Sequence, residues 1–226
     1  MALDNVSFKI RRGEIYCVYG PNGAGKTTLC KIACGLLYPT SGVLKILGYD
    51  SVKERKKIAK DIFAVLSDYV GMWDIFQYRV SVYNNLKLIS KLWNISAKEF
   101  ENRLRSVLKD LNLEDKMHEW YQRLSRGYRQ ILWIAATYIV NPEVLILDEP
   151  MVYLDPLLKK KAYFIISELI RRYKITILYT THSINEIGRL CSRVMLLYKR
   201  VIFEGALNEL KMLSINQGKN FFTKMV

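Results

Sequence analysis

A short glycine-rich segment constrains the fold of this chain more than any other feature of its sequence. The segment reads GPNGAGKT, matches the pattern G-x-x-x-x-G-K-[ST], and comprises Gly20, Pro21, Asn22, Gly23, Ala24, Gly25, Lys26 and Thr27, with a second threonine at Thr28. It follows Ile15–Tyr19, an apolar run rich in β-formers, and leads into Thr27–Leu37, which has the pattern of a helix. The sequence therefore predicts a phosphate-binding loop between a buried strand and a helix.

Each residue type in this loop suits the binding of phosphate. The glycines let the backbone wrap closely around an anion and point its N–H groups inward, and the following helix presents the end at which its dipole favours an anion. Lys26 supplies a positive charge for the β- and γ-phosphates, and the hydroxyl of Thr27 is a ligand for Mg²⁺. We therefore expect the chain to bind a nucleoside triphosphate, ATP in the first instance, together with Mg²⁺.

A second group of polar residues follows two other apolar runs. Val144–Pro150 reads VLILDEP, a buried strand that ends in two acids, and such acids need cations or water. Next to a phosphate loop, Asp148 would hold the Mg²⁺ and Glu149 would orient and deprotonate the attacking water, although Glu149 could instead cap a surface turn. His182 follows the run Ile175–Tyr179, at the strand end where α/β sheets bind ligands, and it could contact the γ-phosphate.

Apolar patterning predicts an α/β fold with a mostly parallel sheet and a helical insertion. Strand patterns alternate with helix patterns at both ends of the chain, around a helical middle. The further predicted strands are Val43–Leu47, Phe63–Leu66, Val144–Leu147 and the hairpin of Val194–Leu197 with Val201–Phe203; the predicted helices are Glu99–Leu113, Ile131–Ile139 and Leu158–Ile170.

Composition excludes several classes of protein. Half of the 226 residues are apolar, which excludes a disordered chain. The longest uncharged apolar run, Ile131–Val140, is far shorter than the roughly 20 residues that cross a bilayer, and the first residues lack the apolar stretch of a signal peptide, so we expect a cytoplasmic protein. The net charge of +14 favours an anionic partner without selecting one.

Cysteine and histidine are scarce. Four cysteines are too few to staple a fold of this size with disulfides. Cys30 and Cys34 would share a helix face, which suits either a metal or, as the usual case, small buried thiols. With two histidines in the chain, any metal is expected to have oxygen ligands.

Together these motifs resemble the nucleotide-binding subunit of an ABC transporter, over nearly the whole chain. The specific stretch is Leu124–Pro156, LSRGYRQILWIAATYIVNPEVLILDEPMVYLDP. Leu124, Ser125 and Gly127 match the family signature LSGGQ, whereas Arg126 and Tyr128 depart from it. Leu154 and Asp155 match the D-loop, and the spacing of His182 after Asp148 matches the family's H-loop.

The resemblance implies a P-loop NTPase with a RecA-like core at about residues 1–67 and 141–205. A helical subdomain would occupy about 68–140, a C-terminal tail about 206–226, and a small N-terminal antiparallel β part would complete a single cassette. Family members hold ATP on the phosphate loop of one subunit and close Ser125, Gly127 and Asp155 of a second over it. Glu149 and His182 would then hydrolyse the ATP.

The resemblance also implies partners. They are membrane-spanning permease subunits and a second cassette in a head-to-tail homodimer or heterodimer, on the inner face of the cell membrane. The S-x-G-x-x-Q form of the signature leans toward export. Exposed-looking aromatics at Trp73, Phe76 and Tyr78 suit either contact with the membrane subunit or a place in the core.

The chain departs from the family pattern in three places. Asp68 takes the position of the Q-loop glutamine and would join Thr27 and Asp148 at the metal, although a shift of one residue would put Ser67 there. The family usually carries an upstream aromatic that stacks on adenine, and none precedes Leu3 here. Either this sequence starts too late, or base stacking is lost or supplied otherwise. Arg126 adds a cation to the signature, which either approaches the neighbour's phosphate or faces solvent.

Two other functions remain open at this point. The positive charge would also suit a soluble ABC ATPase acting on nucleic acid or the ribosome, but such proteins usually carry two cassettes or long insertions, so nucleic acid is not the expected partner. The altered signature and Q-loop would also fit a cassette without catalysis. The basic runs at Lys53–Lys60 and Lys159–Lys161 suit work beside an anionic membrane face.

Overall fold

The central feature of the fold is a six-stranded sheet in which five adjacent strands are parallel and the sixth, at one edge, is antiparallel to its neighbour. The computed structural model describes residues 1–67, 76–111 and 113–216. The strands follow the order β4-β5-β6-β1-β7-β8. Their bounds are β1 Ile15–Tyr19, β4 Ile62–Val65, β5 Val144–Asp148, β6 Thr176–Thr181, β7 Arg193–Tyr198 and β8 Arg200–Ala206. A separate antiparallel pair consists of β2 Lys45–Ile46 and β3 Tyr49–Asp50.

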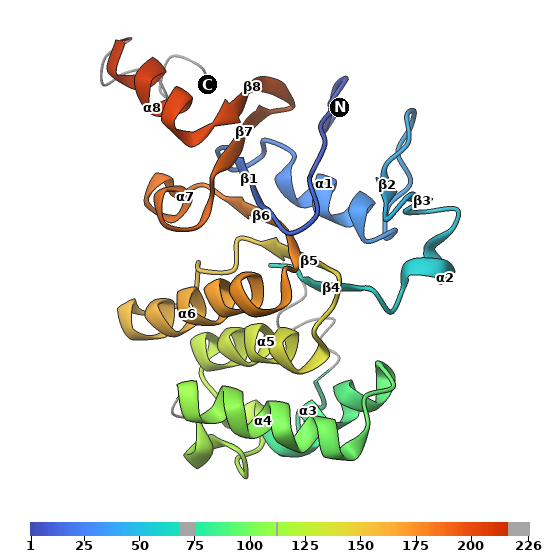
Figure 1. Cartoon of the computed structure of the whole chain (residues 1–226), viewed down its shortest axis with the longest axis vertical. Helices are drawn as coiled ribbons and strands as arrows, with labels where there is room; N and C mark the ends of the chain where they lie inside the picture. The colour runs from blue at the N-terminus through green and yellow to red at the C-terminus, as the bar shows by residue number, and fades with distance from the viewer. Residues whose placement is uncertain (68–75, 112, 217–226) are drawn as a thin grey trace.

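Helices lie between the strands. Three of them, α3 to α5, stand between β4 and β5 in the chain and form the lower part of the molecule in Figure 1, where α5 lies along α6. The bounds are α1 Lys26–Ala33, α2 Arg55–Ile58, α3 Val82–Leu92, α4 Ala97–Leu111, α5 Arg126–Val140, α6 Pro156–Tyr173, α7 Ile184–Leu190 and α8 Leu207–Asn216. Short 3₁₀ turns occupy Glu114–Lys116 and Tyr121–Arg123. This order of elements agrees with the predicted helical insertion. The predicted boundaries of that insertion, about residues 68 and 140, stay a prediction.

The central strands of the sheet are buried on both faces, because their alternate residues enter different apolar clusters. On β5, Leu145 and Leu147 face the cluster that contains α3 to α6, whereas Ile146 faces the cluster on the α1 side. On β1, Cys17 and Val18 divide in the same way. Burial on both faces explains why these strands read as continuous apolar runs. It also leaves the strand ends as the places where polar side chains gather.

Several predicted boundaries were wrong at the ends of elements. The helix predicted at Thr27–Leu37 ends at Ala33, and the strand predicted at Val43–Leu47 is reduced to Lys45–Ile46. The helix predicted from Ile131 begins five residues earlier, at Arg126, because Ser125 caps it. Part of the predicted tail is helical as α8, and residues 217–226 lie outside the described part. The predicted hairpin is confirmed as β7 and β8.

The aromatic residues of the central region divide between core and surface. Phe76 is buried, with its ring stacked 4.7 Å from Tyr121 and edge-on to Trp133 at 4.7 Å. Tyr78 is 40% exposed. Trp73 lies outside the described residues. The core role is therefore the correct one for Phe76.

One disulfide, Cys17–Cys191, joins β1 to the residue after α7, with the two Cα atoms 6.0 Å apart. The cysteine count did not point to this bond. The thiol of Cys30 is buried, and burial raises its pKa well above the ordinary value. Within the described ranges, no set of three histidine, cysteine or acidic side chains forms a metal cage. Cys34 is half-buried beside Cys30 on the same helix face.

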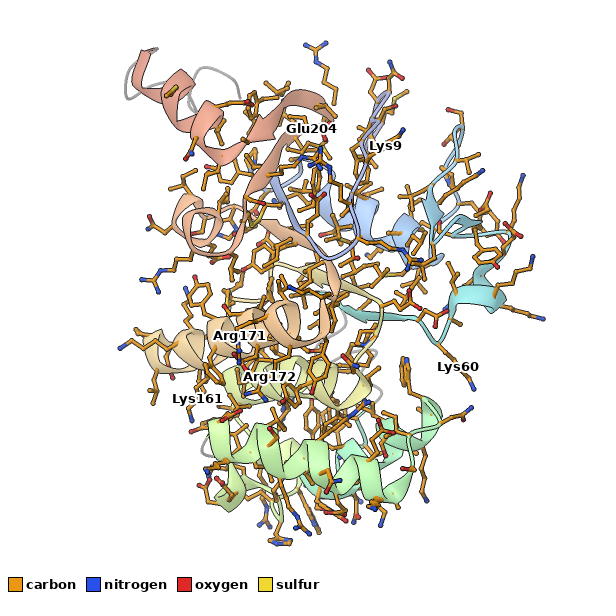
Figure 2. All side chains as sticks on the ribbon, in the orientation of Figure 1. Lys9, Lys60, Lys161, Arg171, Arg172 and Glu204 are labelled. Carbon is orange, nitrogen blue, oxygen red and sulfur yellow. A yellow bond between two sulfur atoms is a disulfide. The ribbon has the colours of Figure 1, made fainter. Side chains whose placement is uncertain are left out.

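The basic runs lie mostly at the surface. Figure 2 labels Lys60, which is exposed between α2 and β4, and Lys161, which is half-buried on α6. In residues 1–67, 76–111 and 113–216, no helix combines the length and the apolar character needed to cross a membrane.

Candidate functional site

The phosphate loop occupies residues 20–25, between the end of β1 and the start of α1. Gly25 caps α1 in a left-handed conformation, with φ of 101°. A Cβ at Gly25 would lie 2.5 Å from the carbonyl oxygen of Ala2 and 2.6 Å from the side chain of Leu3. The backbone therefore needs glycine here both for conformation and for space. As predicted, the strand, loop and helix follow one another, so the N-terminus of α1 opens toward the loop.

Lys26 is the first residue of α1 and is almost fully buried, with 4% of its surface exposed. Its Nζ donates to the carbonyl oxygens of Gly20 at 2.7 Å and Pro21 at 2.9 Å. The same Nζ lies 3.0 Å from Glu149 Oε1. A buried ammonium group needs such partners because its desolvation is costly.

Asp148 ends β5 and is completely buried, but its carboxylate is well satisfied. Oδ2 accepts hydrogen bonds from Thr27 Oγ1 at 2.8 Å and Ser67 Oγ at 2.9 Å, and Oδ1 accepts one from Thr180 Oγ1 at 2.6 Å. Thr27 belongs to α1, Ser67 follows β4, and Thr180 belongs to β6. Because β4 and β6 lie on either side of β5 in the sheet, their ends lie beside Asp148. The cluster offers one carboxylate and several hydroxyls, the hard oxygen ligands that suit Mg²⁺.

The structure brings together two of the three residues predicted to hold the metal, while the metal site itself stays a prediction. Thr27 and Asp148 lie together as expected, whereas Asp68 lies outside the described residues. Ser67, the position that a one-residue shift would select, reaches Asp148 directly. Sequence reasoning did not assign Thr180 at all. The feature of the sequence that could have pointed to Thr180 is the pair of threonines in ILYTTHS, at the end of a predicted strand.

Glu149 lies between Lys26 and His182. Its Oε2 is 2.8 Å from His182 Nδ1, and its Oε1 makes the ion pair with Lys26. The residue adopts φ of 49°, and its backbone N–H donates to both oxygen atoms of Thr180 at 3.1 Å. The backbone turn therefore directs a carboxylate back over the phosphate loop. The alternative of a simple surface cap does not describe this side chain, which is 15% exposed.

The loop that carries His182 is fixed by a buried carboxylate. Glu186 Oε2 accepts hydrogen bonds from Tyr179 at 2.7 Å and Thr181 at 2.8 Å, while Thr181 Oγ1 accepts one from the N–H of Ser183 at 2.9 Å. Burial, and then the charge of Glu186, raise the pKa of the Tyr179 hydroxyl well above its ordinary value, so it stays a donor. These bonds hold the backbone on both sides of His182.

The signature residues lie at the start of α5, and the D-loop residue Asp155 lies at the start of α6. Ser125 caps α5 and is exposed, and its Oγ accepts a hydrogen bond from the N–H of Tyr128 at 3.3 Å. Asp155 caps α6 and accepts bonds of 2.8 Å from the N–H groups of Leu157 and Leu158. Both side chains are therefore helix caps in the isolated chain, and both are at the surface.

Gly127 lies where the start of α5 packs against the start of α6 and the residues before it. Its backbone packs so tightly that a Cβ would lie 2.9 Å from the carbonyl oxygen of Tyr153 and 3.0 Å from Leu158 Cδ1. Beside it, Arg126 is exposed and places its guanidinium 3.5 Å from the centre of the Tyr153 ring. Neither of the two roles considered for Arg126 included this contact. Tyr153 itself was not singled out from the sequence.

A family model described as ABC transporter matches residues 3–152. The chain belongs to the ABC transporter family. This ABC protein is 31% identical to the ABC transporter ATP-binding protein NatA of Bacillus subtilis, over 92% of this chain and 83% of that protein.

Other relatives of this ABC protein carry names that refer to different roles, drug resistance and import. The doxorubicin resistance ATP-binding protein DrrA of Mycobacterium tuberculosis is 35% identical over 93% of this chain and 62% of that protein. The methionine import ATP-binding protein MetN 1 of Bacillus thuringiensis is 32% identical over 91% of this chain and 61% of that protein. The chain thus spans less than two thirds of these two proteins.

Solved ABC structures share the fold. One is the ATP-binding subunit of an ABC transporter, with a TM-score of 0.83 and 26% identity over 96% of this chain and 90% of that one. Another is a dimeric ATP-binding cassette bound to ADP and inorganic phosphate after hydrolysis, with a TM-score of 0.79 and 27% identity over 91% of this chain and 90% of that one. The predicted fold class is confirmed, and none of these relatives has a name that refers to nucleic acid.

Proposed function

We propose that this chain binds ATP with Mg²⁺, hydrolyses the ATP, and powers transport through membrane-spanning partner subunits. The observation that carries the proposal is the position of Glu149, whose carboxylate joins Lys26 at 3.0 Å to His182 at 2.8 Å beside the Asp148 cluster. A phosphate loop alone would support binding. A carboxylate poised at the same loop supports hydrolysis, because it can accept a proton from water.

The residues of the phosphate loop would divide the work of binding. Backbone N–H groups of residues 22–28, at the loop and the N-terminus of α1, would hold the phosphates. Lys26 would exchange the carboxylate of Glu149 for a phosphate oxygen. That exchange would free Glu149 to orient the attacking water, with His182 beside it to contact the γ-phosphate.

The metal would bind to Thr27 and Asp148, with Ser67 in place of the missing Q-loop glutamine and Asp68 as the further candidate. When bound, Mg²⁺ neutralises charge on the phosphate oxygens. Thr27 and Ser67 already share Oδ2 of Asp148, so both hydroxyls converge on one point. This convergence supports Ser67 as a member of the site.

A second cassette would complete the site. Ser125, Gly127 and Asp155 of one cassette would face the ATP held by the other, in a head-to-tail homodimer or heterodimer. The exposed Ser125 and the likeness to a dimeric cassette support this arrangement. Membrane-spanning permease subunits at the cytoplasmic face are the proposed further partners. Because the relatives include import and resistance proteins, the leaning toward export is not carried into the proposal.

Phosphate release from ATP by the purified protein tests the proposal. The native chain should release phosphate in the presence of Mg²⁺, while Glu149→Gln should reduce the rate by at least a hundredfold and should collect as an ATP-bound dimer. Lys26→Ala should lose ATP binding. Hydrolysis by Glu149→Gln at the native rate would show that another group is the base.

A further inference from the structure

Two glutamates are buried in the part of the chain that the structure describes, and their charges are balanced in different ways. Glu168 on α6 is 8% exposed and forms ion pairs with Arg171, at 2.8 Å, and with Arg172, both labelled in Figure 2. Glu186, in the first turn of α7, is 7% exposed and is held by two neutral hydroxyl groups of β6. The ion pairs account for the burial of Glu168, whereas the burial of Glu186 needs another explanation.

Stability alone does not explain the buried charge of Glu186. Moving a carboxylate out of water is costly, and neutral donors repay less of that cost than a cation does. Replacing buried charged groups by apolar residues of similar volume is often neutral or stabilising. A buried charge that stability does not favour is a candidate for function, and Glu186 lies next to the loop that carries His182.

One carboxylate oxygen of Glu186 ties α7 to the end of β6. Its Oε2 accepts hydrogen bonds from the hydroxyls of Tyr179, at 2.7 Å, and Thr181, at 2.8 Å. These two residues are two positions apart on a strand, so their side chains point to the same face of the sheet, and α7 packs against β6 and β1 (Figure 1). Thr180 lies between them, points to the other face and donates to Asp148. The end of β6 therefore holds α7 on one face and the candidate metal ligand on the other.

The hydroxyl of Thr181 connects Glu186 to the turn at His182. This hydroxyl has one hydrogen, and because that hydrogen is donated to Glu186, the lone pairs of Oγ1 remain free to accept. They accept a hydrogen bond from the N–H of Ser183 at 2.9 Å. The side chain of His182 is 50% exposed, so packing holds the ring only in part. The hydrogen bonds on either side of it in the chain therefore decide whether the ring can reach Glu149.

We propose that Glu186 is a positioning residue for His182. It acts through the turn and not on the nucleotide, and it keeps His182 Nδ1 at 2.8 Å from Oε2 of Glu149. The inference rests on the proposed function, because it assumes that His182 takes part in hydrolysis. Loss of the acceptor at Glu186 is expected to slow hydrolysis and to leave the binding of ATP, which belongs to the phosphate loop, unchanged.

Steady-state kinetics of ATP hydrolysis with Mg²⁺ test the inference. Glu186→Ala should lower kcat about tenfold or more while the KM for ATP changes by less than about twofold, since a misplaced His182 affects the chemical step. Glu186→Gln should bring kcat back to within about threefold of the native value, because its amide oxygen can accept both hydrogen bonds. Rescue by glutamine would show that the acceptor matters and the charge does not.

Glu168→Ala is the matched control. It removes a carboxylate with nearly the same burial, near the end of α6, and it leaves two arginines without their partner. The variant should be destabilised, which urea denaturation measures, but its kcat should stay near the native value. A loss of kcat in Glu186→Ala that is absent from an equally destabilised Glu168→Ala cannot come from lower stability alone.

A double variant identifies the residue through which Glu186 acts. His182→Ala should lower kcat by at least as much as Glu186→Ala does. If Glu186 acts through His182, adding Glu186→Ala to His182→Ala should lower kcat little further, because the two losses are not independent. A general effect on the structure would instead multiply the two losses.

The outcomes separate the two proposals. If the native protein and His182→Ala hydrolyse ATP at the same rate, the role proposed for His182 is wrong and the inference falls with it. If His182→Ala is slow while Glu186→Ala has the same kcat as Glu168→Ala, the proposed function stands and the inference is overturned. Independent losses in the double variant also overturn it. Thr181→Val removes the connecting hydroxyl, and it replaces Glu186→Ala, with the same expected loss of kcat, if the alanine variant melts early.

Discussion

The carboxylate of Glu149 lies 3.0 Å from the ammonium group of Lys26, so the proposed base and the proposed phosphate-binding cation neutralise each other. Both groups are largely buried, at 15% and 4% exposure of the side chain. In such surroundings an opposite charge matters more than it does at the surface. The phosphates of ATP would have to take the place of this carboxylate at Lys26.

Glu149→Gln should tighten the binding of ATP. The amide leaves Lys26 without a competing anion and removes a negative charge near the phosphates, so the dissociation constant should fall by about threefold to tenfold. Isothermal titration calorimetry with MgATP measures it. Glu143→Gln is the matched control, because Glu143 carries the same charge at an exposed position before β5. Equal affinities of Glu149→Gln and native protein would contradict the competition described above.

Ser67→Ala should weaken the contribution of the metal to nucleotide binding. The variant removes one of the two hydroxyls on Asp148 Oδ2, while Thr27 and Thr180 keep the carboxylate hydrogen-bonded. We expect the affinity for Mn²⁺, followed by electron paramagnetic resonance with ATP present, to fall about threefold to tenfold. ATP binding in EDTA should not change. A loss of affinity in EDTA as well would mean that Ser67 supports the loop and not the metal.

Gly127→Ala should destabilise the fold. The new Cβ would lie 2.9 Å from the carbonyl oxygen of Tyr153, so α5 and the loop before α6 must move apart, at a cost of about 1–3 kcal/mol in the free energy of unfolding. Urea denaturation gives the value. Gly188→Ala is the control, since a Cβ there meets no atom within 4 Å in α7 and should be neutral or stabilising. If Gly127→Ala and Gly188→Ala had similar free energies of unfolding, the argument from packing at Gly127 would be wrong.

Asp155→Ala should cost more stability than Ser125→Ala. Asp155 accepts two hydrogen bonds of 2.8 Å at the start of α6, whereas Ser125 accepts one of 3.3 Å at the start of α5. Losing a cap of the first kind costs about 1–2 kcal/mol, and the weaker cap should cost about 0.5 kcal/mol. Thermal unfolding of Asp155→Ala and Ser125→Ala measures the two losses of stability. Asp155→Asn should recover most of the loss, because asparagine is an equally good cap.

Local patterns account for much of what the sequence alone predicted correctly. The strand at Ile15–Tyr19, the phosphate loop and the start of α1 are adjacent in the chain, so one stretch of sequence contains the strand, the turn and the helix. The acids of VLILDEP were recognised in the same way, from a strand that ends in charge. Errors fell at element ends, as at Ala33 and Arg126, because caps and neighbouring loops decide those positions rather than periodicity.

Contacts between distant segments could not be predicted in this way. Ser67 and Asp148 are 81 residues apart in the chain and meet because β4 pairs with β5. Cys17 and Cys191 are 174 residues apart and meet because β1 lies beside β7 and against α7. The sequence left Phe76 open to a surface role or a core role, and contacts with Tyr121 and Trp133, more than 40 residues away, decide for the core.

The sequence by itself was enough to predict the kind of chemistry: a candidate triphosphate loop, a candidate metal-binding aspartate and a candidate base, in the order of an ABC cassette. Only the tertiary structure decided how these groups are partnered, with Lys26 held by Glu149, Asp148 held by three hydroxyls, and Arg126 held by Tyr153. The reason is physical. Periodicity and motif spacing report which faces are buried and which turns are tight, whereas the order of strands in the sheet sets which ends share one edge.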